Sequence, residues 1–264
     1  MQNSLNLTLV SLFICVILLI PAGAGSQNFP SGYDDALKQF QQKKYDNSLE
    51  IIRLNFQPES QSYEFRMLAA ANYLNLANHQ QALQHLNFCR REHTDRSEPI
   101  TLTAVILRKS GNLYGAAREI IAGLARFPDD VPLRMEMSRV YFLLGKYPQA
   151  RLQLDLILKS DPYNIHAIYL DGLIFIKERR FDEAEFRLSN VLGMKAVPFY
   201  LLPSLHNNLG FVLENIASVN VQNGDAAGAK IKYREAMDHY SKALSYSPDN
   251  KIYMENKNRI SSHL

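Results

Sequence analysis

The sequence contains no tryptophan and only two cysteines, and Cys15 lies inside an apolar stretch near the N-terminus. Removal of that stretch would leave Cys89 alone. A lone cysteine forms no intrachain disulfide, so packing must hold the fold together. The sequence also has no CxxC, HExxH or GxSxG motif and no glycine-rich phosphate loop. These absences predict a chain that is not an enzyme and that carries no metal and no cofactor.

No block of charge of one sign is present either. The 29 Lys and Arg residues are interspersed with 26 Asp and Glu residues, and the net charge is +3. Nucleic-acid binding requires a basic patch or stripe, so nucleic acid is not expected among the partners. The seven histidines are scattered along the chain and are interpreted as ordinary surface or half-buried residues.

The longest apolar run, residues 9–20, is shorter than the roughly 20 residues that span a bilayer. It is followed by a proline and by the small residues Ala22 and Ala24, which resemble a signal-peptidase site. We therefore expect residues 1–24 to be a signal peptide cleaved near Ala24, with 25–32 as a short linker. This predicts a periplasmic or otherwise exported protein. The alternative is an uncleaved anchor that associates the protein with a membrane.

Residue types recur along the rest of the chain with a period of 34 residues. Large apolar residues and a turn glycine keep this period together with small residues at two sites per repeat. The small residues are Ala70, Ala104, Ser138 and Gly172 at one site and Ala82, Ala116, Ala150 and Ala184 at the other. A fixed period of this length is typical of helix-turn-helix repeats, each of which packs on its neighbours.

One repeat, 131–163, shows the whole pattern. Ser138 and Ala150 are small where its two helices are expected to cross, and Leu154 fills the space beside the crossing. The full set is Ser138, Tyr141, Gly145, Tyr147, Ala150, Leu154, Ile157 and Pro162. This set resembles the tetratricopeptide repeat (TPR), in a protein of the exported bacterial type. The resemblance implies an all-α fold, a right-handed α-solenoid of antiparallel helix pairs with five to six repeats.

The resemblance also divides the chain. The predicted parts are a degenerate first repeat at 33–62, four repeats at 63–197, a last repeat at 198–250, and a C-terminal capping helix with a tail at 251–264. The second repeat places Cys89 at an interior helix position, which predicts a buried structural thiol.

The last repeat departs from the period. Gly210 and Ala236 are 26 residues apart, whereas the corresponding residues of the earlier repeats are 12 apart. The extra length equals about four helical turns, which predicts an elongated helical hairpin with its tip at Asn223-Gly224-Asp225. Apolar residues of the two arms are expected to pack together: Leu213, Ile216, Ala217 and Val219 against Ala226, Ala229 and Tyr233. A disordered loop is the alternative.

In this family the first helix of each repeat lines the inner surface of the superhelix. The matching positions are mostly apolar, with Arg139 and Asn207 suited to polar contacts, so they favour a groove for an extended peptide or an amphipathic helix. The predicted groove residues are Met135, Arg139, Phe142, Tyr169, Leu173, Ile176, Asn207 and Phe211. The alternative interpretation is that these residues are intramolecular core.

We therefore expect a non-enzymatic scaffold of the cell envelope that binds a partner protein. A structural subunit of a homo- or hetero-oligomeric envelope complex is the second hypothesis. In that case copies of the chain would bury the inner face and the hairpin. An accessory to a separate catalytic chain is a third.

Overall fold

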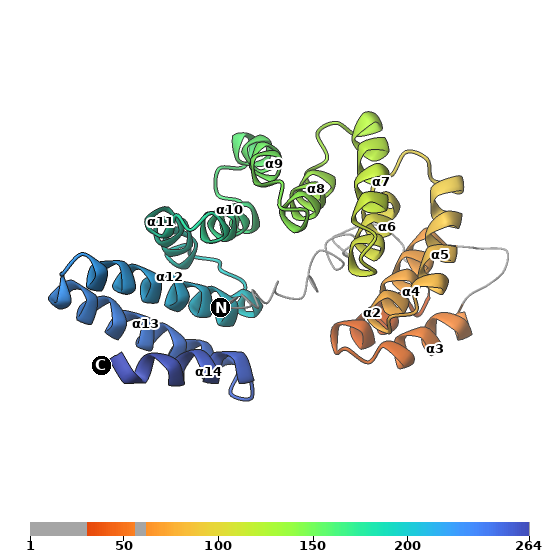
Figure 1. Ribbon diagram of the computed structural model, residues 1–264. Helices are drawn as coiled ribbons and strands as arrows, with labels where there is room; N and C mark the ends of the chain where they lie inside the picture. The colour runs from red at the N-terminus through yellow and green to blue at the C-terminus, as the bar shows by residue number, and fades with distance from the viewer. Residues whose placement is uncertain (1–30, 56–61, 264) are drawn as a thin grey trace. The chain divides into compact units, whose positions relative to one another are not determined.

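The computed structural model describes residues 31–55 and 62–263, and within these ranges the chain forms helices joined by turns, with no strand (Figure 1). The proposed signal peptide and most of the linker lie outside the described residues. The chain divides between Gln153 and Leu154 into an N-terminal unit and a C-terminal unit, and the division falls within one helix. Each unit is all-α and consists of consecutive helix pairs, as the repeat pattern predicts.

In its described residues the N-terminal unit contains four helix pairs, of which the last continues into the C-terminal unit. The pairs are α2 (Tyr33–Gln41) with α3 (Tyr45–Asn55), α4 (Tyr63–Asn75) with α5 (His79–Glu92), α6 (Glu98–Lys109) with α7 (Leu113–Arg126), and α8 (Val131–Leu143) with α9 (Tyr147–Ser160).

Capping side chains fix where several of these helices begin. Asn78 and Asn112, which are 34 residues apart, each accept a hydrogen bond from the backbone N–H three residues later, at the starts of α5 and α7. Asp130 caps α8 in the same way. These oxygens satisfy N–H groups that have no partner within the helix. The repeated Asn therefore sets the start of the second helix in two successive pairs.

The small residues of the repeat lie where the period predicts. Ala82, Ala116 and Ala150 are fully buried, as is Ser138. Cys89 is also fully buried, and burial raises the pKa of its thiol to about 12. Because the thiolate is the reactive form, this confirms the prediction of a structural cysteine.

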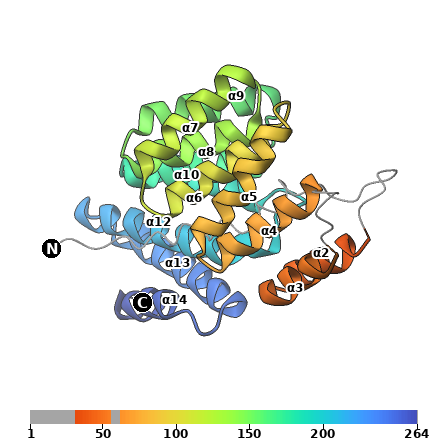
Figure 2. The same cartoon turned by 90° about the vertical axis from the view of Figure 1, so that its right-hand side faces the viewer.

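The described part of the C-terminal unit, from Leu154 onward, contains two further helix pairs and a closing helix (Figures 1 and 2). Its elements after α9 are α10 (Ile165–Lys177), α11 (Phe181–Leu192), the 3₁₀ turn η1 (Phe199–Leu201), α12 (Leu202–Gln222), α13 (Ala226–Tyr246), α14 (Lys251–Ile260) and the 3₁₀ turn η2 (Ser261–His263).

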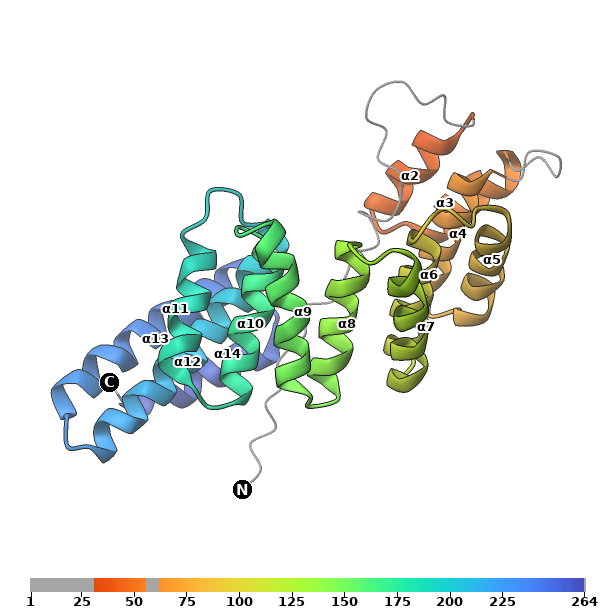
Figure 3. The same cartoon turned by 90° about the horizontal axis from the view of Figure 1, so that it is seen from above.

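The elongated hairpin is confirmed. Helices α12 and α13 have 21 residues each, and the turn between them is Asn223-Gly224-Asp225. Figure 3 shows its tip projecting past α11. Leu213, Ala217, Ala229 and Tyr233 pack between the arms.

Of the other residues expected in this hairpin core, Ile216 is half-buried and two are exposed. Val219 is 44% exposed and Ala226 is exposed as well, so the prediction was wrong for both. They lie in the last turn of α12 and at the start of α13, where the arms have no further helix to pack against. In the described part of the chain, no helix is both long and apolar enough to cross a membrane.

Candidate functional site

The predicted groove residues of the N-terminal unit form a row along α8. Met135, Arg139 and Phe142 follow one another at spacings of four and three residues, which places them on one face of the helix. All three are buried, with 5%, 8% and 5% of their surface exposed. The Phe142 ring lies 5.9 Å from the ring of Tyr147 on α9. The row is therefore continuous, and its apolar members also pack within the unit.

A buried charge cluster adjoins this row. The Nε of Arg108 on α6 donates a hydrogen bond to Glu136 on α8, and the Nη1 of Arg139 lies 3.4 Å from the second oxygen of the same carboxylate. The side chains are 6%, 1% and 10% exposed in the order Arg108, Glu136, Arg139. Two guanidinium groups thus share one carboxylate, and the cluster has a net charge of one positive unit.

One nitrogen of this cluster is unsatisfied. The Nη2 of Arg108 is buried and has no hydrogen-bond partner within the part of the chain that the structure describes. An unpaired buried donor is costly, and native proteins rarely keep one without a reason.

The predicted residues of α10 form a second row, in the C-terminal unit. Tyr169, Leu173 and Ile176 share one face of the helix, and all three are buried. The hydroxyl of Tyr169 accepts a hydrogen bond of 2.8 Å from the Nδ2 of Asn208 on α12. Burial raises the pKa of Tyr169, so the phenol stays protonated. This contact joins α10 to α12 and gives Tyr169 a structural role.

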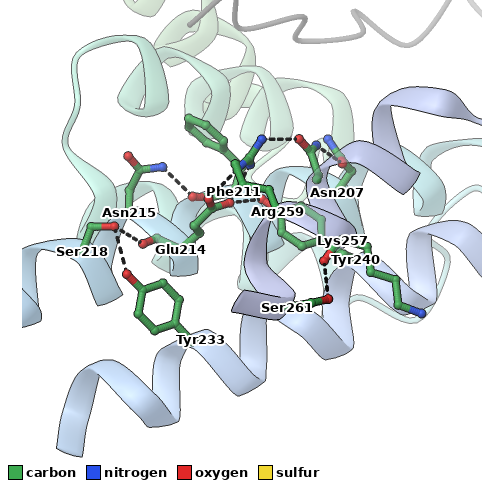
Figure 4. Close-up of polar contacts among 11 residues, drawn as sticks. Asn207, Phe211, Glu214, Asn215, Ser218, Tyr233, Tyr240, Lys257, Arg259 and Ser261 are labelled. Carbon is green, nitrogen blue, oxygen red and sulfur yellow. Dashed lines mark hydrogen bonds and ion pairs between the residues drawn. The ribbon is translucent and has the colours of Figure 1, made fainter. Parts of the chain in front are cut away.

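Asn207, the predicted polar contact on α12, is bonded to the closing helix. Its Oδ1 accepts a 2.8 Å hydrogen bond from the Nδ2 of Asn256 on α14, and 4% of the residue is exposed. Asn256 in turn accepts a hydrogen bond from Arg259 (Figure 4). The inner side of α12 at this residue is therefore occupied by α14.

Glu214, two helical turns further along α12, anchors the same contact. Arg259 donates two hydrogen bonds of 2.7 Å to the two carboxylate oxygens, and the Tyr240 hydroxyl on α13 donates a third of 2.6 Å (Figure 4). The bidentate pair raises the pKa of Arg259, and burial raises that of Tyr240. The Glu214 carboxylate therefore accepts hydrogen bonds from both α13 and α14, and these charge-assisted bonds hold the three helices together.

Phe211 lies between Asn207 and Glu214 along α12 and is only partly buried. Its ring contacts that of Phe181 on α11 edge to face, with 6.4 Å between the centroids. Phe211 is the most exposed of the eight predicted groove residues.

A pair of histidines joins α12 to α13. The Nδ1 atoms of His206 and His239 lie 2.9 Å apart, and Tyr246 stacks on His206 at 5.9 Å. Burial, followed by the nearby His239, lowers the pKa of His206 to about 4. Because one ring nitrogen must accept while the other donates, at most one of the two facing nitrogens carries a proton. The histidines were predicted to be ordinary surface or half-buried residues, so this hydrogen-bonded pair was not predicted from the sequence.

The structure thus places the predicted residues in two groups. Met135, Arg139 and Phe142 lie in the N-terminal unit, whereas the α10 row, Asn207 and Phe211 lie in the C-terminal unit. The partners of these residues were not predicted as site residues: Glu136 and Asn256 sit at no repeated position. The methionines on both sides of Glu136, Met135 and Met137, were the one available signal for its burial. Among the described residues, no group of three or more His, Cys, Asp or Glu side chains could hold a metal ion.

Comparison with known proteins supports the fold through structure alone. No protein-family model matches the sequence, and no curated protein matches it. Several solved structures are similar, at sequence identities that carry the fold and nothing more.

The thermophilic TPR protein TTC0263 of Thermus thermophilus is 19% identical with a TM-score of 0.56, over 76% of this chain and 98% of that one. The C-terminal part of a TPR-repeat protein from Cytophaga hutchinsonii is 14% identical with a TM-score of 0.56, over 91% and 92%. A chain of the APC/C hetero-tetramer Cut9–Hcn1 is 12% identical with a TM-score of 0.59, and this chain spans 48% of its length. The 34-residue period, the paired helices and these likenesses agree that the chain has the tetratricopeptide-repeat fold.

Proposed function

We propose that the protein is a non-enzymatic scaffold that binds a peptide or helix of a partner protein along the first helices of its repeats. The similar TPR structures support an interaction scaffold in general, and one of them is a chain of a hetero-tetramer. The α8 row of the N-terminal unit, which adjoins the cluster of Arg108, Glu136 and Arg139, is the surface that we assign to the partner.

The observation that carries the proposal is the buried cluster of Arg108, Glu136 and Arg139, which has a net positive charge. Repeat packing accounts for the apolar members of the α8 row, but it does not account for two arginines on one carboxylate with a donor left over. The net positive charge of the cluster would favour a carbonyl or carboxylate oxygen of a bound segment. Arg139, at the more exposed end of the cluster, is the side chain that such a segment would meet first.

We also propose that the protein works in the cell envelope. The proposal rests on the apolar run at 9–20 and the small residues after it, together with a fold that needs no disulfide. Fractionation of the host followed by N-terminal sequencing of the recovered protein tests it. A new N-terminus near residue 25 in the exported fraction supports cleavage, an intact N-terminus in the membrane fraction supports the anchor, and recovery from the cytoplasm contradicts both.

The binding proposal is tested by site-specific photo-crosslinking in the native host. A photoreactive amino acid at the neighbouring position Leu143 on α8, 38% exposed, would report contact with a partner segment. We expect the chain with the photoreactive residue to crosslink to a partner. The crosslinked product should be lost when the same chain also carries Arg139→Gln, because the substitution removes the charge that meets the bound segment.

Arg118→Gln is the matched control, since Arg118 is an exposed arginine on α7 of the same unit. Both variants must keep the thermal unfolding midpoint of the parent. Equal crosslinking in the two variants would contradict the α8 surface as the binding site. A crosslink only to a second copy of the chain, with a dimer in sedimentation experiments, would favour the oligomeric subunit.

A further inference from the structure

The outer face of α13 carries a short row of exposed residues near the tip of the hairpin. Ala227, Lys230, Ile231 and Arg234 are all exposed and follow one another at the i, i+3, i+4, i+7 spacing that defines one face of a helix. The buried residues of α13, among them Ala229 and Tyr233, lie on the opposite side. The hairpin core described above therefore does not use this row.

The two cations of the row have no acidic partner among the described residues. The acidic side chains along α13 already have partners: Glu235 pairs with Lys232 at 3.1 Å, and Asp238 pairs with Lys242 at 2.6 Å. Asp225 caps the helix by accepting the N–H of Gly228. Over the described ranges, neither Lys230 nor Arg234 makes an ion pair or a side-chain hydrogen bond.

The basic row therefore has two uncompensated positive charges. Lys232, on the neighbouring face, is satisfied by Glu185 of α11 as well as by Glu235. Among the basic residues of α13, Lys232 and Lys242 thus have acidic partners, whereas Lys230 and Arg234 have none in the described part of the chain.

An aliphatic side chain lies between these charges. Ile231 is 56% exposed, and Val219 and Val221 on the other arm are 44% and 55% exposed. β-Branched residues are poorer helix formers than straight-chain ones, so helix stability does not explain three of them at the exposed end of a helical hairpin. Ile231 gives this face one apolar contact between two positive charges, and such a face complements a helix that has acidic side chains beside an apolar residue.

We propose that the face formed by Ala227, Lys230, Ile231 and Arg234 is a second docking surface, which binds an amphipathic helix with acidic side chains beside its apolar row. A second copy of this chain does not fit, because pairing two such faces would set like charges against each other. The surface lies on the projecting hairpin and is separate from the first-helix rows.

The proposal is tested with a fluorescently labelled synthetic peptide that has leucine at i, i+3, i+4 and i+7 and glutamate at the flanking positions. Its counterpart with lysine in place of glutamate serves as the charge-reversed probe. We expect the acidic peptide to bind the full chain, as followed by fluorescence anisotropy, and to bind more weakly as salt is added. In the Lys230→Glu/Arg234→Glu variant the affinity should fall by at least about tenfold, and the lysine peptide should bind instead.

Two matched controls keep the result specific. Lys159→Glu/Lys195→Glu changes the net charge equally at two other exposed lysines of the C-terminal unit. Ile121→Asp, at an isoleucine that is 57% exposed on α7, matches Ile231→Asp. Only the α13 variants should lose binding, with circular dichroism unchanged in all four.

Equal affinity of the acidic peptide for the parent and for the Lys230→Glu/Arg234→Glu variant would overturn the proposal, as would no binding to the parent. Binding of the parent to vesicles of anionic phosphatidylglycerol, lost in the same variant, together with no binding of the peptide, would instead assign the face to a lipid surface.

Discussion

At the scale of single residues, the turn between paired helices has one position with a left-handed backbone in each of the first five pairs. Lys43, Ala77, Gly111, Gly145 and Arg179 follow one another at intervals of 34 residues, and their φ angles are 62°, 58°, 83°, 70° and 60°. Only glycine adopts this conformation without a steric cost from its side chain. The position is thus fixed by turn geometry, and three repeats occupy it with a strained residue.

We predict that Arg179→Gly stabilises the protein by about 0.5–1 kcal/mol, because the relief of left-handed strain exceeds the entropy that glycine adds to the unfolded chain. Gly145→Ala is the reciprocal change: a Cβ there meets no atom within 4 Å, so φ alone should destabilise the fold by about 1 kcal/mol. Urea unfolding of both variants measures the difference. A loss of stability in Arg179→Gly would show that its side chain outweighs the strain.

Another residue-scale prediction concerns the close approach of α12 and α13. A Cβ on Gly210 would lie 2.8 Å from the ring of Tyr240, which is fully buried and bonded to Glu214. Gly210→Ala should therefore destabilise the protein by about 1–3 kcal/mol through overpacking. Gly193→Ala is the control, since its nearest neighbours would be 3.6 Å away. Equal unfolding midpoints for the two variants would mean that the Tyr240 ring moves freely.

At the scale of elements, the contact between α12 and α13 depends on protonation. The pKa of His206 is about 4 in the folded protein, against 6.5 for an unperturbed histidine, and that of His239 is lowered too. Charged groups around the pair are Asp238, Lys242, Glu235 and Glu185. Because the unfolded chain binds protons that the folded pair rejects, this stabilisation is present above pH 6.5 and is lost as pH falls towards 4.

We predict that the free energy of unfolding decreases from pH 6.5 to pH 4 and that the decrease is smaller in His206→Gln/His239→Gln. Part of the slope should remain, because burial also lowers the pKa of His85 in the N-terminal unit to about 4. Urea titrations at closely spaced pH values measure both slopes. The explanation fails if the double variant keeps the slope of the parent.

The elements also show what the sequence could predict. The 34-residue period predicted the paired helices and the elongated hairpin. Each residue type that recurs with this period marks a contact between the two helices of a repeat, and that contact is present in successive repeats. The pair Glu214–Arg259 spans 45 residues and His206–His239 spans 33, and each occurs once. Neither pair has a repeated counterpart, so periodicity holds no signal for them. The inner face was predicted by helical spacing, but spacing does not distinguish a buried side chain from one that meets a partner.

At the scale of the whole molecule, the order of contacts follows the order of the sequence. The extensive helix contacts in the described ranges join elements that are neighbours or next neighbours along the chain, such as α4 with α5 and α12 with α13. In a repeat array of this kind, stability is close to a sum of repeat and neighbour terms. A local defect should then loosen nearby helices without unfolding distant ones.

We predict this for Ala82→Leu, which overpacks a fully buried position of α5 and should cost about 1–3 kcal/mol. Native-state hydrogen exchange should show lower amide protection in α4, α5 and the helices beside them, and unchanged protection in α12, α13 and α14. Gly210→Ala should give the converse pattern, with the loss confined to α12, α13 and their neighbours. An equal loss of protection at every helix in either variant would mean that the chain unfolds as one cooperative unit, since only global opening exposes amides in both units together.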